Sequence, residues 1–256
     1  MYLAASSRTR ATTIGWLSCP GEGVIDRSLN YGRSCIRLFL ERARPYRDVL
    51  DIGAGRGYDL EIALEVEPAA RLLALEAFAP SIAVLREKGV EAHSVDIERE
   101  PFPFPPESVD VVIANQILEH TKEVFWILDQ VSATLREGGR LLIGVPNLAS
   151  LHNRILLLFG RQPTSIRNRL AHVRGFTKGD LEALVEAGFP GGYRLREFRG
   201  ANFYPFPPFA AKPLARALPT MAWGIFLDFE KVRPYGREFL EYPVREQLET
   251  NFYLGS

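Results

Sequence analysis

The chain has 256 residues, which is enough for one large α/β domain with insertions or for two small domains. Lys and Arg together number 31, as do Asp and Glu, and this zero net charge argues against a nucleic-acid-binding surface. Its only cysteines, Cys19 and Cys35, cannot form a disulfide framework or a zinc site, so we predict reduced thiols and no metal. No apolar run resembles a secretion signal or a membrane span, which predicts a cytoplasmic protein without a membrane span.

The chain begins with a lead-in, residues 1–24, that is rich in turn-forming residues and shows no clear period. Apolar residues with helical spacing then predict an amphipathic helix from Ile25 to Ala43. Tyr31 and Arg33 lie near its start. We interpret them as part of a solvated helix face rather than as ligand contacts.

A glycine-rich turn follows the first predicted strand. Arg47–Ile52 is a short apolar run, Gly53, Gly55 and Gly57 interrupt it at alternate positions, and Asp59–Leu64 resumes with helical spacing. Glycine is favoured where the backbone turns with positive φ and approaches a ligand closely. The pattern therefore predicts a loop from strand to helix that cradles a nucleotide. The alternative is a purely structural turn.

The acid before this turn indicates the kind of ligand. Asp51 lies two residues before Gly53, so the spacing is Asp-x-Gly-x-Gly-x-Gly and differs from the Gly-x-Gly-x-x-Gly that seats a diphosphate. A carboxylate at this position is a natural partner for an ammonium group. The turn thus suits a zwitterionic amino-acid moiety better than a diphosphate.

Two further acids follow predicted strands. Arg71–Glu76 ends in Glu76, which can accept both hydroxyls of a ribose from the neighbouring strand end. Val90–Val95 is followed by Asp96 and Ile97, which suit the amino group and the ring of adenine. The alternative for each acid is an ordinary exposed side chain.

Strands and helices continue to alternate. Val109–Ala114 predicts a buried fourth strand, a helix is expected to start within Asn115–His120 and to run past Val131, and Arg140–Val145 predicts a fifth strand. This alternation predicts a doubly wound α/β fold with a mostly parallel sheet, helices on both faces and ligands at the carboxyl ends of the strands.

Two insertions are expected to rise over that edge. The first, about 147–178, lies in a stretch without Asp or Glu from Gly138 to Gly179, and the second is about 200–221. Between them we expect a helix over Asp180–Phe189, and the strands Tyr193–Phe198 and Ala222–Val232 form an antiparallel hairpin. The predicted core domain is 25–231. The tail, 232–256, has no predicted place.

This ordered set of motifs resembles class I S-adenosylmethionine-dependent methyltransferases, in particular the small-molecule group that includes ubiquinone-biosynthesis methyltransferases. Val49–Gly57 matches the first motif of that family, and Asn115–His120, Leu135–Asn147 and His172–Thr177 match later motifs in order. The resemblance covers roughly residues 25–231. It implies a seven-stranded Rossmann-like sheet with an antiparallel final hairpin and cap insertions.

The resemblance also implies S-adenosylmethionine as cofactor and a methyl acceptor that is a small molecule. Asp51, the glycine turn and the backbone near Asn115 would hold the methionine portion, Glu76 the ribose, and Asp96 with Ile97 the adenine. The implied cofactor-binding residues are Asp51, Gly53, Ala54, Gly55, Gly57, Glu76, Ala77, Asp96, Ile97, Asn115 and Gln116. His120 and His172 are the candidate bases if the acceptor is a hydroxyl group, which we favour over nitrogen or carbon.

Several alternatives remain at this point. The cationic first insertion suits a phosphate- or carboxylate-bearing acceptor, whereas its Leu156–Phe159 run suits an apolar or aromatic one. Both features are also compatible with a solvated basic face and plain packing. A hydride-transferring NAD(P)-dependent oxidoreductase and a non-catalytic, methyltransferase-like partner subunit are the competing functions. The oligomeric state has no signature in the sequence.

Overall fold

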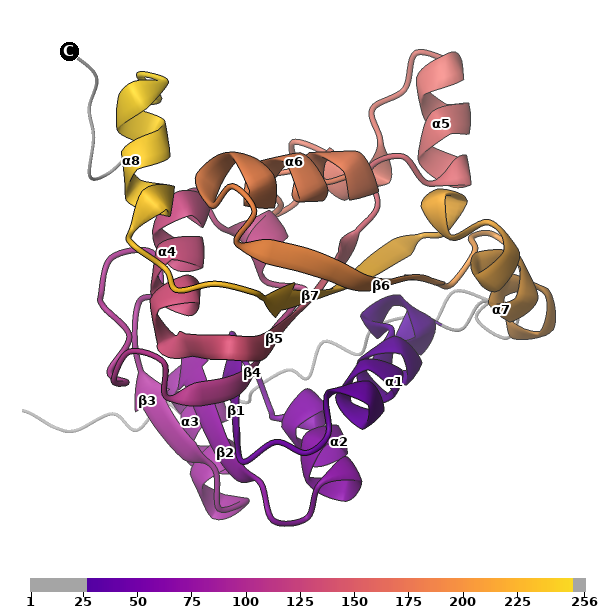
Figure 1. Cartoon of the computed structure of the whole chain (residues 1–256). Helices are drawn as coiled ribbons and strands as arrows, with labels where there is room; N and C mark the ends of the chain where they lie inside the picture. Colours follow the sequence, from indigo (N-terminus) through magenta and orange to yellow (C-terminus); the bar gives the residue numbers. More distant parts are fainter. Residues whose placement is uncertain (1–26, 251–256) are drawn as a thin grey trace, which may run out of the picture.

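The computed structural model describes residues 27–250, and its centre is a seven-stranded sheet in the order β3-β2-β1-β4-β5-β7-β6 (Figure 1). Strands β1 to β5 run parallel, whereas β7 pairs antiparallel with β5 and β6. The predicted mostly parallel sheet with an antiparallel final hairpin is thus confirmed. The strands are β1 (Asp48–Ile52), β2 (Arg71–Glu76), β3 (Glu91–Ser94), β4 (Val109–Asn115), β5 (Leu135–Pro146), β6 (Tyr193–Ala201) and β7 (Gly224–Lys231).

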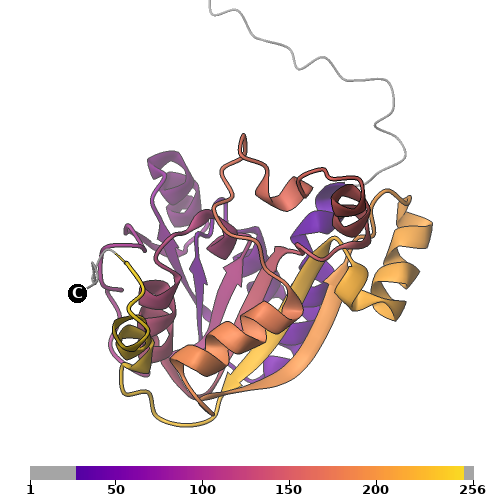
Figure 2. The ribbon, with the colours of Figure 1, turned by 90° about the horizontal axis from the view of Figure 1, so that it is seen from above.

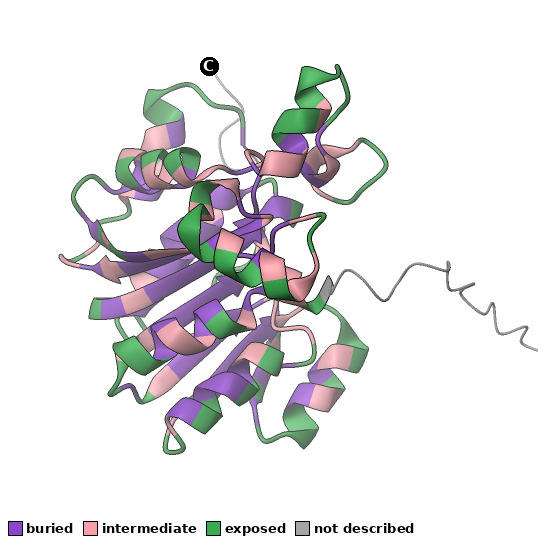
Figure 3. Ribbon diagram, turned by 90° about the vertical axis from the view of Figure 1, so that its right-hand side faces the viewer, coloured by how far each residue is buried: buried purple, intermediate pink, exposed green. Residues whose placement is uncertain are grey.

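Helices cover both faces of the sheet, and each face has its own apolar core (Figure 2). Helices α1, α2 and α3 pack on one face, and α4, α6 and α8 pack on the other. The buried strands lie between these layers, while the outer helix faces are exposed (Figure 3). The helices are α1 (Arg33–Ala43), α2 (Tyr58–Val66), α3 (Ala79–Glu87), α4 (Val124–Thr134), α5 (Leu151–Leu158), α6 (Lys178–Gly188), α7 (Pro208–Ala217) and α8 (Glu238–Arg245).

The predicted first helix is divided in two, which corrects the continuous helix expected over Ile25–Ala43. A 3-10 helix, η1 (Arg27–Tyr31), comes first, and α1 begins only at Arg33. Gly32 between them has a φ of 54°, a left-handed conformation that stops helix propagation. The residue before α1 is therefore a hinge in the backbone that turns Tyr31 towards the strand ends.

The segment after β4 also differs from the prediction of one helix that starts within Asn115–His120. Gln116 has a φ of 57°, a short 3-10 helix η2 (Leu118–His120) follows, and α4 begins at Val124. A positive φ is unfavourable for a residue with a side chain and is retained mostly where a site requires it. The irregular backbone keeps the side chains of Gln116 and His120 at the edge of the sheet.

Both expected insertions lie at the edge where β5 and β6 end (Figure 1). The first contains α5 and the 3-10 helix η3 (Thr164–Ile166), and the second contains α7 and the 3-10 helix η4 (Pro219–Met221). The tail that had no predicted place forms α8, which packs on α4 and α6. Within residues 27–250, no helix is long and apolar enough to cross a membrane. The lead-in 1–24, with Cys19, lies outside the described residues.

Candidate functional site

The glycine turn joins β1 to α2 with an open face. Gly53, Gly55 and Gly57 all have positive φ angles, of 72°, 53° and 81°. A Cβ atom on Gly53 would lie 2.6 Å from Ile117 Cδ1, so this position has no room for a side chain. A Cβ on Gly55 would meet nothing within 4 Å. The turn is thus packed on the side of β4 and free at Gly55, where a ligand can approach the backbone. Ala54, between them, is only half-buried.

Glu76 at the end of β2 is tied to this turn. One carboxylate oxygen accepts a hydrogen bond from the Gly55 N–H at 2.8 Å, and the other accepts one from the Phe78 N–H at 2.8 Å. These bonds fix the direction of the carboxylate, and each oxygen keeps a second lone pair for a ligand. Ala77, beside it, is exposed. The predicted acid and the predicted turn therefore form one unit.

A group of acids lies beneath the turn. Asp51 is buried, and burial raises the pKa of its carboxyl group well above the usual range, with a further increase from Asp59 and Glu76. Burial also raises the pKa of Asp59, which the Asn115 hydrogen bond and Arg33 counteract. Asp59 Oδ1 is buried without a hydrogen-bond partner. A cationic ligand group here would relieve the repulsion between these acids.

The Arg33 side chain lies close enough to Asp59 to lower the pKa of its carboxyl group. Its guanidinium carbon lies 4.9 Å from the centre of the Tyr31 ring and 4.5 Å from the centre of the Tyr58 ring, and its Nε is buried without a partner. Asn115 donates from Nδ2 to Asp59 at 2.7 Å and to the Tyr31 carbonyl at 3.0 Å, while its Oδ1 is buried and unpaired. Tyr31 is exposed, as expected of a solvated helix face, whereas Arg33 is only half-buried and packs between two aromatic rings.

A buried donor, Arg33 Nε, and two buried acceptors, Asp59 Oδ1 and Asn115 Oδ1, thus lie near the ends of β1 and β4 without a hydrogen-bond partner. Such groups are rare in folded proteins because each one costs free energy unless a partner is present. Arg33 suits a carboxylate, whereas Asp59 suits an ammonium group. The residues present therefore fit a zwitterionic amino-acid moiety.

Asp96 and Ile97 follow β3, at the same edge of the sheet. Asp96 Oδ1 accepts from the Glu98 N–H at 3.1 Å, and its other oxygen lies 3.8 Å from Arg99 Nε. The Asp96 side chain is 47 % exposed, and Ile97 packs partly against the apolar core. The structure places both residues next to the β2 end that carries Glu76, since β2 and β3 pair in parallel.

A cavity of about 560 Å³ opens beside Asn115, between η1, the η2 segment and the first insertion. Tyr31 connects this cavity with the region of the glycine turn. Its carbonyl accepts a hydrogen bond from Asn115, and Tyr31 also lines the cavity. Gln116 lines the cavity too, and its Nε2 is buried without a partner. The other lining residues are Asn30, Glu119, His120, Pro146, Thr164, Ser165, Arg167, Arg169, Leu170, His172 and Trp223.

The two predicted bases meet in this cavity. The rings of His120 and His172 lie 4.6 Å apart between centroids, edge to face, although the two residues come from separate segments of the chain. His172 Nδ1 is within 2.8 Å of the Ser165 carbonyl, which orients the ring. Burial lowers the pKa of His120, and the neighbouring His172 lowers it further. His120 is therefore neutral at neutral pH.

Glu119 completes a trio with these histidines. Its side chain is 2 % exposed, its Oε2 has no hydrogen-bond partner, and burial raises its pKa to about 7. The ligand atoms of Glu119, His120 and His172 all lie within 4.8 Å of one another, which is compatible with a divalent cation. The sequence-based expectation of no metal remains a prediction.

Several residues of this region carry no clear signal in the sequence. Asp59 has the sequence context of an ordinary helix residue, and Glu119 lies within the motif Asn115–His120 without a role of its own that the sequence indicates. Arg167 and Arg169 contribute to the charge of the first insertion without a defined place, and Trp223 fits a strand. Their contribution depends on tertiary contacts between segments far apart in the chain.

Comparison with known proteins shows the family of the chain. A family model described as a methyltransferase domain matches residues 27–189. The chain is 31 % identical over 157 residues to a probable S-adenosylmethionine-dependent methyltransferase of Mycolicibacterium smegmatis, over 61 % of this chain and 57 % of that protein. It is 29 % identical over 144 residues to a probable S-adenosylmethionine-dependent methyltransferase of Mycobacterium tuberculosis, over 56 % of this chain and 48 % of that protein.

Solved structures share the fold. The 1,6-didemethyltoxoflavin N1-methyltransferase of Burkholderia thailandensis, with bound 1,6-didemethyltoxoflavin and S-adenosylhomocysteine, has a TM-score of 0.54 and 20 % identity, over 81 % of this chain and 80 % of that one. The chain spans about half the length of the curated relatives that it matches. Because the family model covers more than half of the chain, the resemblance seen in the motifs is confirmed, and this chain belongs to the methyltransferase domain family.

Proposed function

We propose that the chain is a methyltransferase that transfers the methyl group of S-adenosylmethionine to a hydroxyl oxygen of a small anionic acceptor. One observation carries the proposal. The acid-and-glycine turn, which fits an amino-acid zwitterion and a ribose, adjoins at Tyr31 and Asn115 a cavity that contains a neutral histidine and two arginines. The proposed site for the methyl donor and the proposed site for the methyl acceptor are thus adjacent.

The cofactor would lie along the ends of β1, β2 and β4. Asp51 and Asp59 face its ammonium group, Arg33 its carboxylate, and Gly55 allows close approach to the backbone. Glu76 accepts from the ribose hydroxyls, while Asp96 and Ile97 contact the adenine. The bound cofactor supplies an electrophilic methyl group on a sulfonium.

The protein then has two tasks. It must hold the acceptor oxygen in line with the methyl group, and it must take the proton from the hydroxyl. His120 is the proposed proton acceptor, because it is neutral and lines the cavity of about 560 Å³, which we call the acceptor cavity. His172, which Ser165 orients, holds the His120 ring edge to face. Gln116 orients the acceptor.

Arg167 and Arg169 indicate an anionic acceptor. Both line the cavity, and no ion pair neutralises either of them within residues 27–250. Trp223 and Leu170 line it as well and offer contact to an apolar or aromatic body. A phenolic carboxylic acid combines these features: its carboxylate suits the arginines and its ring suits Trp223.

We expect the double variant Arg167→Ala/Arg169→Ala to raise the KM for a phenolic carboxylic acid by about 10- to 100-fold, with little change in kcat, because the lost charge pairs act in binding. The uncharged amide of the same acid should be affected less than threefold. Steady-state kinetics of both acceptors measures this. Arg154→Ala/Arg245→Ala removes two cations elsewhere and serves as the control. Equal losses for the acid and the amide would contradict an anionic acceptor.

The acid group predicts a pH-dependent cofactor affinity. Asp51 and Asp59 have raised pKa values in the free protein, and a cationic ligand favours their ionised forms. Affinity for S-adenosylmethionine should therefore increase as the pH rises through these raised pKa values, with proton release at the lower pH. Asp51→Asn should weaken binding and flatten this dependence, as calorimetry in buffers of different ionisation enthalpy would reveal. Wild-type affinity that stays constant across the acidic range would refute this electrostatic role.

The competing functions make different predictions. An NAD(P)-dependent oxidoreductase would bind NADH, whereas we expect binding of S-adenosylmethionine and S-adenosylhomocysteine only. A non-catalytic partner subunit would bind the cofactor without turnover. The turn, Asp51 and Glu76 retain the contacts that a bound cofactor needs, which supports an active enzyme.

A further inference from the structure

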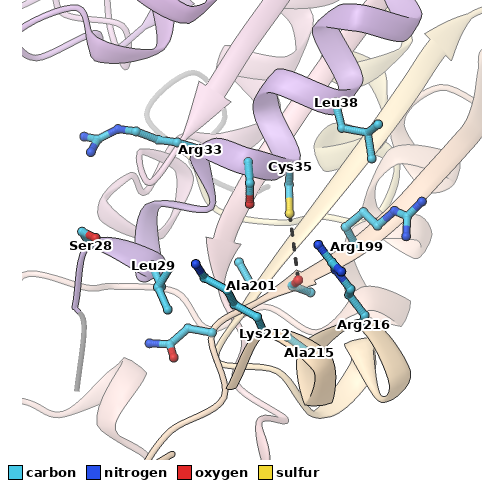
Figure 4. Close-up of a pocket in the computed structure, with 13 residues that line it drawn as sticks. Ser28, Leu29, Arg33, Cys35, Leu38, Arg199, Ala201, Lys212, Ala215 and Arg216 are labelled. Atoms are coloured by element: carbon cyan, nitrogen blue, oxygen red, sulfur yellow. Dashed lines mark hydrogen bonds between the residues drawn. The ribbon is translucent and has the colours of Figure 1, made fainter. Parts of the chain in front are cut away.

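A second cavity, of about 640 Å³, lies between the start of α1, the end of β6 and α7 (Figure 4). The helix η1 separates it from the acceptor cavity, because Ser28 and Leu29 line this cavity while Asn30 and Tyr31 line the other. None of the proposed reaction steps takes place in it.

Among the described residues, the charged groups in its lining are all cations, and no carboxylate lines it. Arg199 on β6 and Lys212 and Arg216 on α7 lie together, whereas the Arg33 side chain points away from these three (Figure 4). Figure 4 shows Lys212 and Arg216 on one face of α7, with Arg216 beside Arg199. The remaining ionisable group, the Cys35 thiol, has a pKa raised to about 11 by burial and therefore adds no negative charge at neutral pH.

Within residues 27–250, few groups neutralise this positive charge. Arg199 forms an ion pair with Glu197, but Lys212 and Arg216 form no ion pair within residues 27–250. These two lie four residues apart on α7, where like charges repel. The surrounding segment, residues 198–227, contains no Asp or Glu.

We propose that this cavity binds a phosphate-bearing small molecule. Lysine and arginine together are the usual partners of phosphate, and a group with two negative charges would offset the repulsion between Lys212 and Arg216. Leu38 and Ala215 form an apolar part of the cavity wall, which suits the organic part of the ligand. The volume is that of a site for a molecule of metabolite size. A single carboxylate would leave most of the positive charge unpaired.

Calorimetric titration with pyrophosphate, in the presence of saturating S-adenosylhomocysteine, tests the proposal. We expect binding with an affinity that falls as salt concentration increases. Lys212→Ala/Arg216→Ala should weaken binding at least tenfold. Both side chains are exposed, so the variant should fold, and its thermal unfolding midpoint checks this.

The control Arg194→Ala/Arg245→Ala removes the same charge from distant surfaces and should bind pyrophosphate within twofold of wild type. A loss of equal size in the control would overturn the proposal, as would unchanged binding in Lys212→Ala/Arg216→Ala. Failure of the methyl-transfer proposal would leave this result unaffected, since the titration measures no turnover.

Discussion

Replacing Glu76 with alanine should reduce the affinity for S-adenosylmethionine by about 10- to 150-fold, which corresponds to roughly 1.5–3 kcal/mol for the loss of a charged hydrogen-bond acceptor. The structure gives two reasons for a large effect. The carboxylate is the proposed partner of the ribose hydroxyls, and it also accepts a hydrogen bond from the Gly55 N–H at 2.8 Å, so its removal frees the turn that we propose as the cofactor cradle.

Calorimetry on wild type and variant would measure this difference. Glu87→Ala is the matched control, because Glu87 is an exposed glutamate on α3 outside the site. Circular dichroism should show equal folding of both variants. Binding by Glu76→Ala within twofold of wild type would remove Glu76 from the cofactor site.

His120→Ala should lower kcat by about 100- to 10,000-fold, the usual contribution of a positioned general base, while the cofactor affinity changes less than twofold. The pKa of His120 is lowered by burial and by His172, so its base form is present over a wide range. The wild-type rate should therefore rise with pH through the acidic range and level off before neutrality. His172→Ala should lower kcat by a smaller factor.

Two controls distinguish proton transfer to His120 from a general effect of losing a histidine and from metal binding. His93→Ala changes a histidine on β3, away from the acceptor cavity, and should leave kcat unchanged. A chelator should also have no effect. If chelation abolished turnover and a divalent cation restored it, Glu119, His120 and His172 would hold a metal ion, and His120 would not be the base.

The sequence was sufficient for the elements whose signals are local. The run Arg71–Glu76 has the predicted bounds, because a strand covered on both faces is a continuous apolar segment between polar residues. The glycine turn was equally readable, since alternate glycines after a strand reflect backbone angles that few other residues adopt. These local signals predicted the strand and the turn to which we assign the cofactor.

Periodicity failed where the backbone is irregular. Gln116 adopts a positive φ, which a glutamine in a sequence does not indicate, so the continuous helix predicted after β4 was wrong. The acceptor side depends on contacts across the chain: Arg167 and Trp223 lie in distant segments and meet only in the folded structure. The place of Arg33 is hidden for the same reason, because one of its partners, Tyr58, belongs to α2, which the sequence alone does not bring next to α1.

Product analysis with deuterium-labelled S-adenosylmethionine tests directly whether a methyl group is transferred to the oxygen of an anionic acceptor. The protein would be incubated with phenolic carboxylic acids, their amides and matched aromatic amines, and products would be identified by mass spectrometry and nuclear magnetic resonance. We expect a trideuteromethyl group on the hydroxyl oxygen, with acids preferred over amides. Methylation on nitrogen or carbon, or cofactor binding without any methylated product, would contradict methyl transfer to oxygen.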